Sequence, residues 1–92
     1  MKELPPLSPR QEQALRIIHG FVERRGLGPS LRELATGLGL RTSNPNLHLQ
    51  PLIKKGYVDK DPERPTYSLR VTTAGRRWLA SHPEAQASLP LR

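Results

Sequence analysis

Three carboxamide side chains stand close together near the middle of this sequence, at Asn44, Asn46 and Gln50. A carboxamide places a donor beside an acceptor, and this pair matches the edge that adenine presents in the DNA major groove. Asn44 is also well placed to cap a helix, so a structural and a functional role both stay open for it. The three residues predict base reading, provided that one element holds them in a groove.

Hydroxyl and cationic side chains near these amides could bind phosphates. Thr42 and Ser43 offer hydroxyls or backbone N–H groups at a helix start, where the helix dipole favours anions. Arg41 has no carboxylate near it in the sequence, so we expect it to contact a phosphate or a base. The other candidates are basic residues that could contact the DNA backbone or the minor groove: Arg32, Lys54, Lys60, Arg64 and Arg70. For Lys54 a purely structural role also stays open, because a cation in the last turn stabilises a helix without DNA.

The charge of the chain favours a polyanionic partner. Its 92 residues carry a formal net charge of +7, and residues 41–80 hold eight Lys and Arg against three Asp and Glu. A basic region in a small domain is typical of nucleic-acid binding, and the amides make double-stranded DNA the expected partner. A basic surface also aids solubility, and this plainer interpretation stays open.

Other functional classes lack the residues that they need. There is no cysteine, and His19, His48 and His82 stand far apart, so we expect no metal site. No catalytic triad, glycine-rich phosphate loop or pair of catalytic carboxylates can be assembled, so we expect no enzyme activity, cofactor or small-molecule ligand. No run is long and apolar enough to cross a membrane, and "MKELPPLSPRQ" is not a signal peptide. A cytoplasmic protein is therefore expected.

Two helices with defined ends should precede the amides. Ser8 and Gln11 form a capping box, and an apolar stripe at three- and four-residue steps then runs to Gly26. Ser30 and Glu33 form a second capping box, and "GLG" ends that helix. The predicted buried residues of the two helices are Ala14, Leu15, Ile18, Phe21, Val22, Leu31, Leu34, Ala35 and Leu38.

A third helix and a hairpin complete the pattern. The segment from Ser30 to Gly56 reads as helix, turn and helix, the helix-turn-helix arrangement whose second helix enters a major groove. The runs "YVDK" and "TYSLRV", separated by "DPERP", predict a two-stranded hairpin, and Thr72 caps a last helix that ends at Pro83. We predict an α+β winged helix-turn-helix fold, with a three-helix core, a two-stranded β-hairpin wing and a short C-terminal helix.

The third helix contains two prolines with different expected effects. Pro45 lies in the first turn after an Asn44 cap, where its missing N–H would have no partner. Pro51 removes the bond to the Leu47 carbonyl, at a cost of roughly 3 kcal/mol in an unbent helix. We expect a kink near 47–51, which lets the first turn face the groove. The residues that should stay in the core are Leu49, Leu52 and Ile53. The alternative is a helix used only structurally, with base reading lost.

The stretch from Leu7 to Val71 resembles the amino-terminal DNA-binding domain of LexA repressors. "LSPRQ" fits the family's "L-x-x-R-Q" opening, "GLGPS" fits its "G-x-x-P-[ST]" turn, and "HLQPLIKKG" fits the "H-L-x-x-L-x-x-K-G" end of its recognition helix. The resemblance implies a winged helix that binds DNA as a transcriptional regulator. The end "YSLRVTTAGRRWL" is closer to the "L-T-x-x-G" junction of MarR-like regulators.

Three departures limit what the resemblance implies. No counterpart of the family's Ser/Lys self-cleavage domain follows, and the segment between Gly39 and His48 is one residue shorter than is usual in the family. Asn46 and Leu47 stand where the family's helix is commonly acidic. The family's operator sequence is therefore not expected to apply.

These features predict sequence-specific binding of double-stranded DNA by a transcriptional regulator, with the third helix in the major groove and the wing on the backbone. The alternative is a winged helix that docks on a polymerase or another regulator. Trp78 and Leu79 on the last helix predict a homodimer contact, because readers of this kind place two copies on a two-fold operator. The domain should span 8–82, with an arm at 1–7 and a mobile tail at 83–92.

Overall fold

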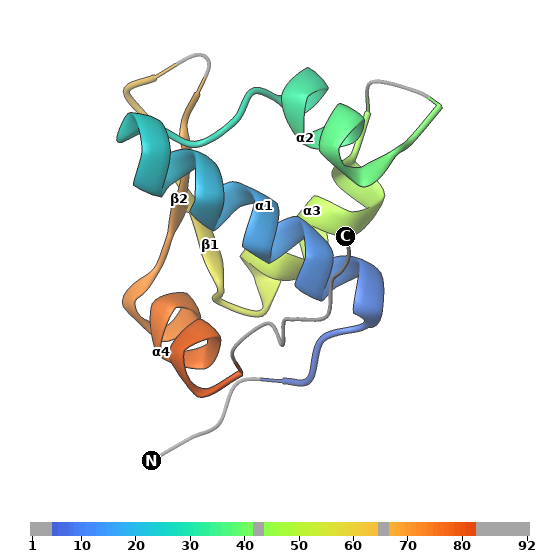
Figure 1. Cartoon of the computed structure of the whole chain (residues 1–92). Coiled ribbons are helices and arrows are strands. Elements are labelled where there is room, and N and C mark those ends of the chain that lie inside the picture. The colour runs from blue at the N-terminus through green and yellow to red at the C-terminus, as the bar shows by residue number, and fades with distance from the viewer. Residues whose placement is uncertain (1–4, 42–43, 65–66, 83–92) are drawn as a thin grey trace.

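The structure is a computed structural model that describes residues 5–41, 44–64 and 67–82. The elements in chain order are α1 (Pro9–Arg25), α2 (Leu31–Leu38), α3 (Asn46–Lys54), β1 (Val58–Lys60), β2 (Leu69–Val71) and α4 (Thr73–Ser81). In Figure 1, α1 crosses the front of the molecule, with α2 and α3 toward one side and the hairpin and α4 toward the other. This arrangement confirms the predicted α+β winged helix-turn-helix fold. The predicted tail at 83–92 lies outside the described residues.

Three of the four helices begin at the hydroxyl residues that the sequence predicts. The side chains of Ser8, Ser30 and Thr72 each accept a hydrogen bond from the N–H three residues later. In α1 and α2 the bond is reciprocated, because Gln11 Oε1 accepts from the Ser8 N–H and Glu33 Oε1 from the Ser30 N–H. Both capping boxes are therefore confirmed.

The turn between α1 and α2 is held by an ion pair as well as by its backbone. Gly26 ends α1 with φ 77°, a left-handed conformation that costs glycine little. Arg25 Nη2 then lies 2.9 Å from Glu33 Oε1 in the first turn of α2. The hydrogen bond from Arg25 lowers the pKa of the Glu33 carboxyl. The stability that the Arg25–Glu33 ion pair contributes is therefore present at neutral pH and is lost as the pH falls through the lowered pKa of Glu33.

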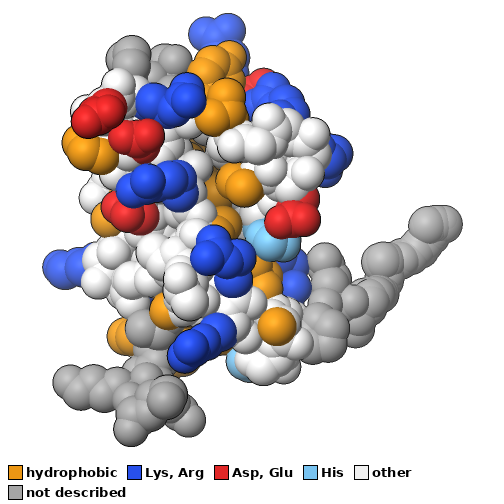
Figure 2. Space-filling model, turned by 90° about the vertical axis from the view of Figure 1, so that its left-hand side faces the viewer, with side chains coloured by type: hydrophobic (Ala, Val, Ile, Leu, Met, Phe, Trp, Pro, Cys, Tyr) orange, Lys and Arg blue, Asp and Glu red, His pale blue; other side chains and the backbone are white. Residues whose placement is uncertain are grey.

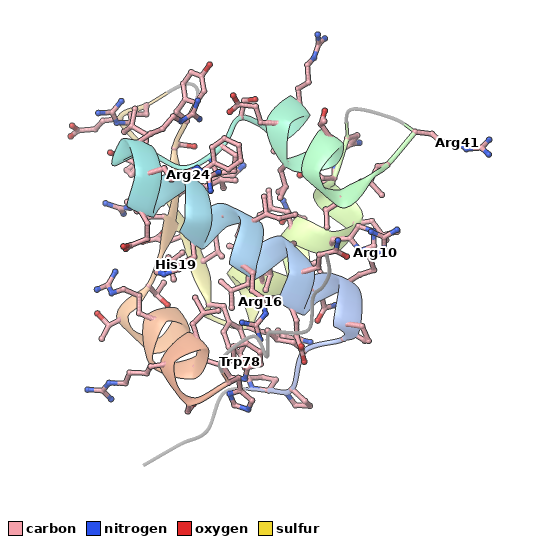
Figure 3. The ribbon with its side chains drawn as sticks, viewed as in Figure 1. Arg10, Arg16, His19, Arg24, Arg41 and Trp78 are labelled. Atoms are coloured by element: carbon pink, nitrogen blue, oxygen red, sulfur yellow. The ribbon has the colours of Figure 1, made fainter. Side chains whose placement is uncertain are left out.

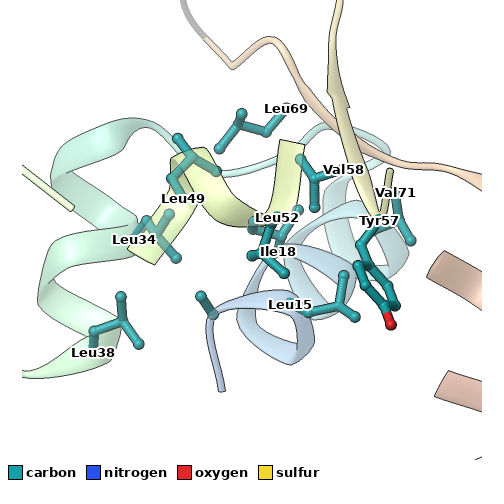
Figure 4. Packing of buried hydrophobic residues seen from close by; sticks show 11 residues of the cluster. Leu15, Ile18, Leu34, Leu38, Leu49, Leu52, Tyr57, Val58, Leu69 and Val71 are labelled. Carbon is teal, nitrogen blue, oxygen red and sulfur yellow. The ribbon is translucent and has the colours of Figure 1, made fainter. Parts of the chain in front are cut away.

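One apolar core joins all the elements except α4, which packs against its edge (Figure 4). Its fully or nearly buried residues are Ala14, Leu15, Ile18, Leu34, Leu38, Leu49, Leu52, Tyr57, Val58, Leu69 and Val71. The predicted core is confirmed for most of α1 and α2. Leu31 was expected inside and is 39% exposed, and Phe21, Val22 and Ile53 are only partly buried. The spacing of apolar residues along a helix predicts the centre of its buried stripe. The width of that stripe depends on which other elements pack against the helix.

The hairpin is shorter than the sequence runs that predict it. β1 and β2 pair antiparallel, with Val58 opposite Val71 and Asp59 opposite Arg70. The Asp61 N–H donates to the Ser68 carbonyl at 2.8 Å and extends the pairing by one bond toward the loop. Valines therefore face the core, while the charged pair faces solvent.

The described part of the amino-terminal arm is tied to the domain. Lys55 Nζ donates to the Pro6 carbonyl at 2.7 Å and to Gln11 Oε1 at 2.9 Å. The Tyr57 hydroxyl donates to the Pro5 carbonyl at 2.6 Å. Leu7 adds a partly buried apolar contact. No helix in the described ranges is long and apolar enough to span a membrane.

Helix α4 sits against the end of the hairpin because Gly75 has no side chain. A Cβ atom there would overlap the Tyr57 carbonyl and lie 2.9 Å from Val71 Cγ1. Gly20, within α1, has a different setting, since its Cβ would meet only Arg24 Nη1, at 3.3 Å. The end of an arginine side chain can move aside, whereas a backbone carbonyl cannot.

We predict that Gly75→Ala and Gly20→Ala shift stability in opposite directions. Alanine favours a helix over glycine by up to about 1 kcal/mol, so Gly20→Ala should be stabilising. At Gly75 the overlap should outweigh this gain and lower the free energy of unfolding by about 1–3 kcal/mol. Thermal and urea unfolding of both variants measure the effect. A Gly75→Ala protein at least as stable as the parent would contradict the close packing of α4 on the Tyr57 backbone.

Candidate nucleic-acid interface

Helix α3 has one face in the core and one face in solvent. Leu49 and Leu52 are fully buried against the other helices. Leu47, Gln50 and Lys54 are exposed and lie at three- and four-residue steps along the opposite side. α3 therefore presents an apolar group, an amide and a cation in a row, on a helix that could enter a DNA groove.

The start of α3 differs by one residue from the prediction. Asn44 was expected as the N-cap, but Pro45 occupies that position, with φ −87° and ψ 14°. The Asn44 side chain still acts at this end, because its Oδ1 accepts from the Asn46 N–H at 3.1 Å. The Pro45 carbonyl accepts from the N–H groups of His48 and Leu49. The predicted N-cap role of Asn44 is therefore wrong, and its amide oxygen instead stabilises the turn that leads into the helix.

Pro51 lies inside α3, and the helix continues past it. The Lys55 N–H donates to the Pro51 carbonyl at 2.8 Å, so the turn after the proline is intact. The missing N–H affects only the Leu47 carbonyl, four residues earlier. Leu47 is 80% exposed, so the turn that carries this carbonyl lies at the surface of the domain. The helical placement is confirmed, and the kink at 47–51 stays a prediction.

The candidate phosphate-binding residues form two groups. Arg32, Arg41, Lys54 and Lys60 are exposed, and none of them forms an ion pair with another described residue. Arg41 points away from the body of the domain beside α2 (Figure 3). Thr42 and Ser43 lie outside the described residues.

The other two candidates are paired with carboxylates on the hairpin. Arg70 Nη2 lies 3.0 Å from Asp59 Oδ2, its partner across the two strands. Arg64 Nε lies 3.7 Å from Asp61 Oδ2 in the loop. Figure 2 shows the same mixture, with Asp and Glu side chains among the Lys and Arg of the hairpin and α4 side. The wing is therefore less positive than its count of basic residues implies.

Sequence reasoning left two exposed cations of this face out of the site, Arg76 and Arg77 in α4. Arg76 Nη1 donates to the Val71 carbonyl at 2.9 Å, so it also holds the start of α4 against β2. Their signal in the sequence is the pair of adjacent arginines in the stretch predicted to form the last helix. No group of His, Asp and Glu in the described ranges could hold a metal ion.

The geometry can now be compared with known proteins. The family model of the LexA DNA binding domain matches residues 4–66. The chain belongs to this family. It is 38% identical over 84 residues to the LexA repressor of Frankia casuarinae, which covers 90% of this chain and 30% of that relative.

Two further LexA repressors extend the similarity. The one from Limosilactobacillus fermentum is 40% identical over 83 residues, 89% of this chain and 39% of the relative. The one from Leptothrix cholodnii is 33% identical over 107 residues, 99% of this chain and 46% of the relative. The chain thus spans less than half the length of these LexA relatives. The likeness of its end to MarR-like regulators stays a prediction.

We predict that Pro51→Ala stabilises this LexA-family domain. Alanine supplies the N–H that the Leu47 carbonyl lacks, and helix propensity favours it by up to about 3 kcal/mol. Part of this gain is lost because proline restricts the unfolded chain and its half-buried ring already packs. Thermal unfolding measures the difference.

The matched control is Pro45→Ala. Pro45 is fully buried at the N-cap position, where no helical N–H is required, so its loss should only remove contacts and destabilise the domain. If Pro51→Ala lowers the melting temperature as Pro45→Ala does, packing of the Pro51 ring outweighs the missing hydrogen bond.

Proposed function

We propose that this chain binds double-stranded DNA in a sequence-specific manner and thereby regulates transcription. α3 would lie in the major groove, and the hairpin would follow the backbone. The observation that carries the proposal is the division of α3 into a buried face and a solvent face bearing Gln50, in a chain of the LexA DNA-binding domain family. The relatives that it matches carry the name LexA repressor, which supports a role in repression.

The two amides of α3 are the proposed base-reading residues. Gln50 is exposed near the middle of the helix, and no described residue accepts or donates a hydrogen bond to its side chain in the structure. Asn46 stands at the first helical position, in the turn that usually touches bases in helix-turn-helix proteins. Both side chains can pair with the N6 and N7 atoms of adenine.

The hairpin would contribute mainly through Lys60. Its ammonium has no carboxylate partner among the described residues, so binding a phosphate breaks no existing ion pair. To bind a phosphate, Arg70 and Arg64 would have to weaken or break their ion pairs with Asp59 and Asp61. This reduces the affinity for DNA that each arginine adds. Arg32, Arg41 and Lys54 complete the proposed set of phosphate contacts.

The proposal predicts duplex binding that weakens steeply with salt. Each neutralised phosphate should lower log K by roughly 0.9 per log unit of salt concentration. Fluorescence anisotropy on random duplexes, on single strands and on a sequence selected from a random library would measure it. Absence of duplex binding at low salt and micromolar protein would reject the proposal and favour docking on another protein.

Two variants separate base reading from backbone contact. Gln50→Ala should cost roughly 1–3 kcal/mol on the selected duplex and little on random DNA. Lys60→Ala, the matched control, should weaken both duplexes alike and reduce the salt slope by about one phosphate contact. Equal effects of the two variants on every duplex would show that Gln50 reads no base.

We also propose that two copies act together through α4. Trp78 and Leu79 were the residues expected at this contact, and both are only partly buried within the chain. Trp78 already packs edge-on to Tyr57 and stacks on His82, with ring centroids 6.1 and 4.1 Å apart. A dimer contact would therefore use the parts of Trp78 and Leu79 that stay exposed beside these ring contacts.

Sedimentation of the free protein and of its complex with a selected two-fold duplex tests the assembly. We expect two chains per duplex, because a LexA-family reader gains affinity from paired half-sites. Leu79→Glu should reduce this to one chain per duplex, while Ala80→Glu adds the same negative charge at an exposed position of α4 and serves as the control. One parent chain on a two-fold duplex would contradict the assembly.

A further inference from the structure

Leu47 is the most exposed large hydrophobic side chain among the described residues. It is 80% exposed, compared with 39% for Leu31 and 40% for Tyr67. It is the second residue of α3 and lies on the face that carries Gln50 and Lys54. The core of α3 is formed by Leu49 and Leu52, so Leu47 contributes nothing to the packing of the domain.

Single exposed leucines are common on protein surfaces. Leu47 differs from these because it lies on the face of α3 that carries Gln50 and Lys54. Helix formation does not require leucine here, because glutamine, glutamate or lysine has nearly the same propensity. The half-buried Pro51, four positions on, is a neighbour of Leu47 on the helix surface. Leu47 and Pro51 thus form a short apolar strip beside Gln50, on the surface that the proposed function places in the groove.

We propose that Leu47 contacts the C5-methyl group of a thymine in the major groove. The inference rests on the proposed DNA binding and adds thymine to the bases that α3 would contact. Leucine has no donor or acceptor, so against any other base edge it would bury polar atoms without partners. The thymine C5-methyl is the one methyl group that an unmodified base presents in this groove.

The neighbouring amide makes the contact more specific. Leu47 and Gln50 are three residues apart on the helix, which places their Cβ atoms about 5–6 Å from each other. Base pairs follow one another at about 3.4 Å, so the two side chains reach the same or adjacent pairs. In an A·T pair the adenine edge and the thymine methyl share the groove. Gln50 on adenine and Leu47 on thymine would therefore read one A·T-containing step together.

The test replaces thymine by uracil, which removes the methyl group and leaves the base-pairing atoms in place. In a duplex selected from a random library, each thymine in turn is changed to uracil, and affinity is measured by anisotropy. One position should weaken binding of the parent protein by about fourfold, the value expected for one buried methyl group. Leu47→Ala should bind the thymine duplex less tightly and lose the uracil effect at that position.

Two further variants serve as controls. Leu47→Gln keeps the length of the side chain and should also lose the uracil effect, while Gln50→Ala should retain it. Thermal unfolding should show all three variants folded, because both positions are exposed. Duplex binding without a uracil-sensitive position, or sensitivity that persists in Leu47→Ala, would overturn this inference and leave DNA binding intact. No duplex binding at all would reject the proposed function and the inference with it.

Discussion

The buried Tyr57 connects α3 to the hairpin, to α4 and to the amino-terminal arm. Its N–H donates to the Leu52 carbonyl and closes α3, and its own carbonyl accepts from the backbone and the side chain of Thr72 before α4. Its ring meets Trp78 edge-on, and its hydroxyl reaches the Pro5 carbonyl. Burial, with a smaller contribution from a nearby carboxylate, raises the pKa of this hydroxyl, so it stays protonated and donates across the neutral range. One residue thus fixes α3, the hairpin, α4 and the arm relative to one another.

This constraint explains how α3 tolerates an internal proline. The buried face of the helix is held by Leu49 and Leu52 and by the bonds that lead into Tyr57, all of which lie on the core side or after the proline. The missing hydrogen bond falls on the exposed side, at the Leu47 carbonyl. Loss of one bond in this exposed turn leaves the buried contacts of Leu49 and Leu52 in place. The outer face can therefore carry residues that serve a partner.

The features that could be predicted from the sequence are those with local causes. Ser8 and Ser30 start helices through bonds to residues only three positions away, so a short pattern determines them. The pairing of Arg70 with Asp59 depends instead on strand register, which residues far apart in sequence set. Leu31 belongs to a correct apolar stripe, yet its edge of the helix is only partly covered, and it stays 39% exposed. The starts of α1, α2 and α4 and the centre of the core were thus accessible from the sequence, whereas the free or paired state of each wing cation was not.

Contacts of arginines within the domain limit what the net charge of +7 indicates about a nucleic-acid partner. Several arginines donate to carbonyls at the ends of elements: Arg10 to Leu38, Arg16 to His82 and Arg76 to Val71. Cations at helix C-termini stabilise a domain whether or not DNA is present. Others pair with carboxylates or lie over aromatic rings, as Arg25 does with Glu33 and Phe21. The outward face of α3 is largely uncharged by comparison. Discrimination between sequences would therefore depend on the shape and hydrogen bonding of that face, with the unpaired cations adding affinity that is nearly independent of sequence.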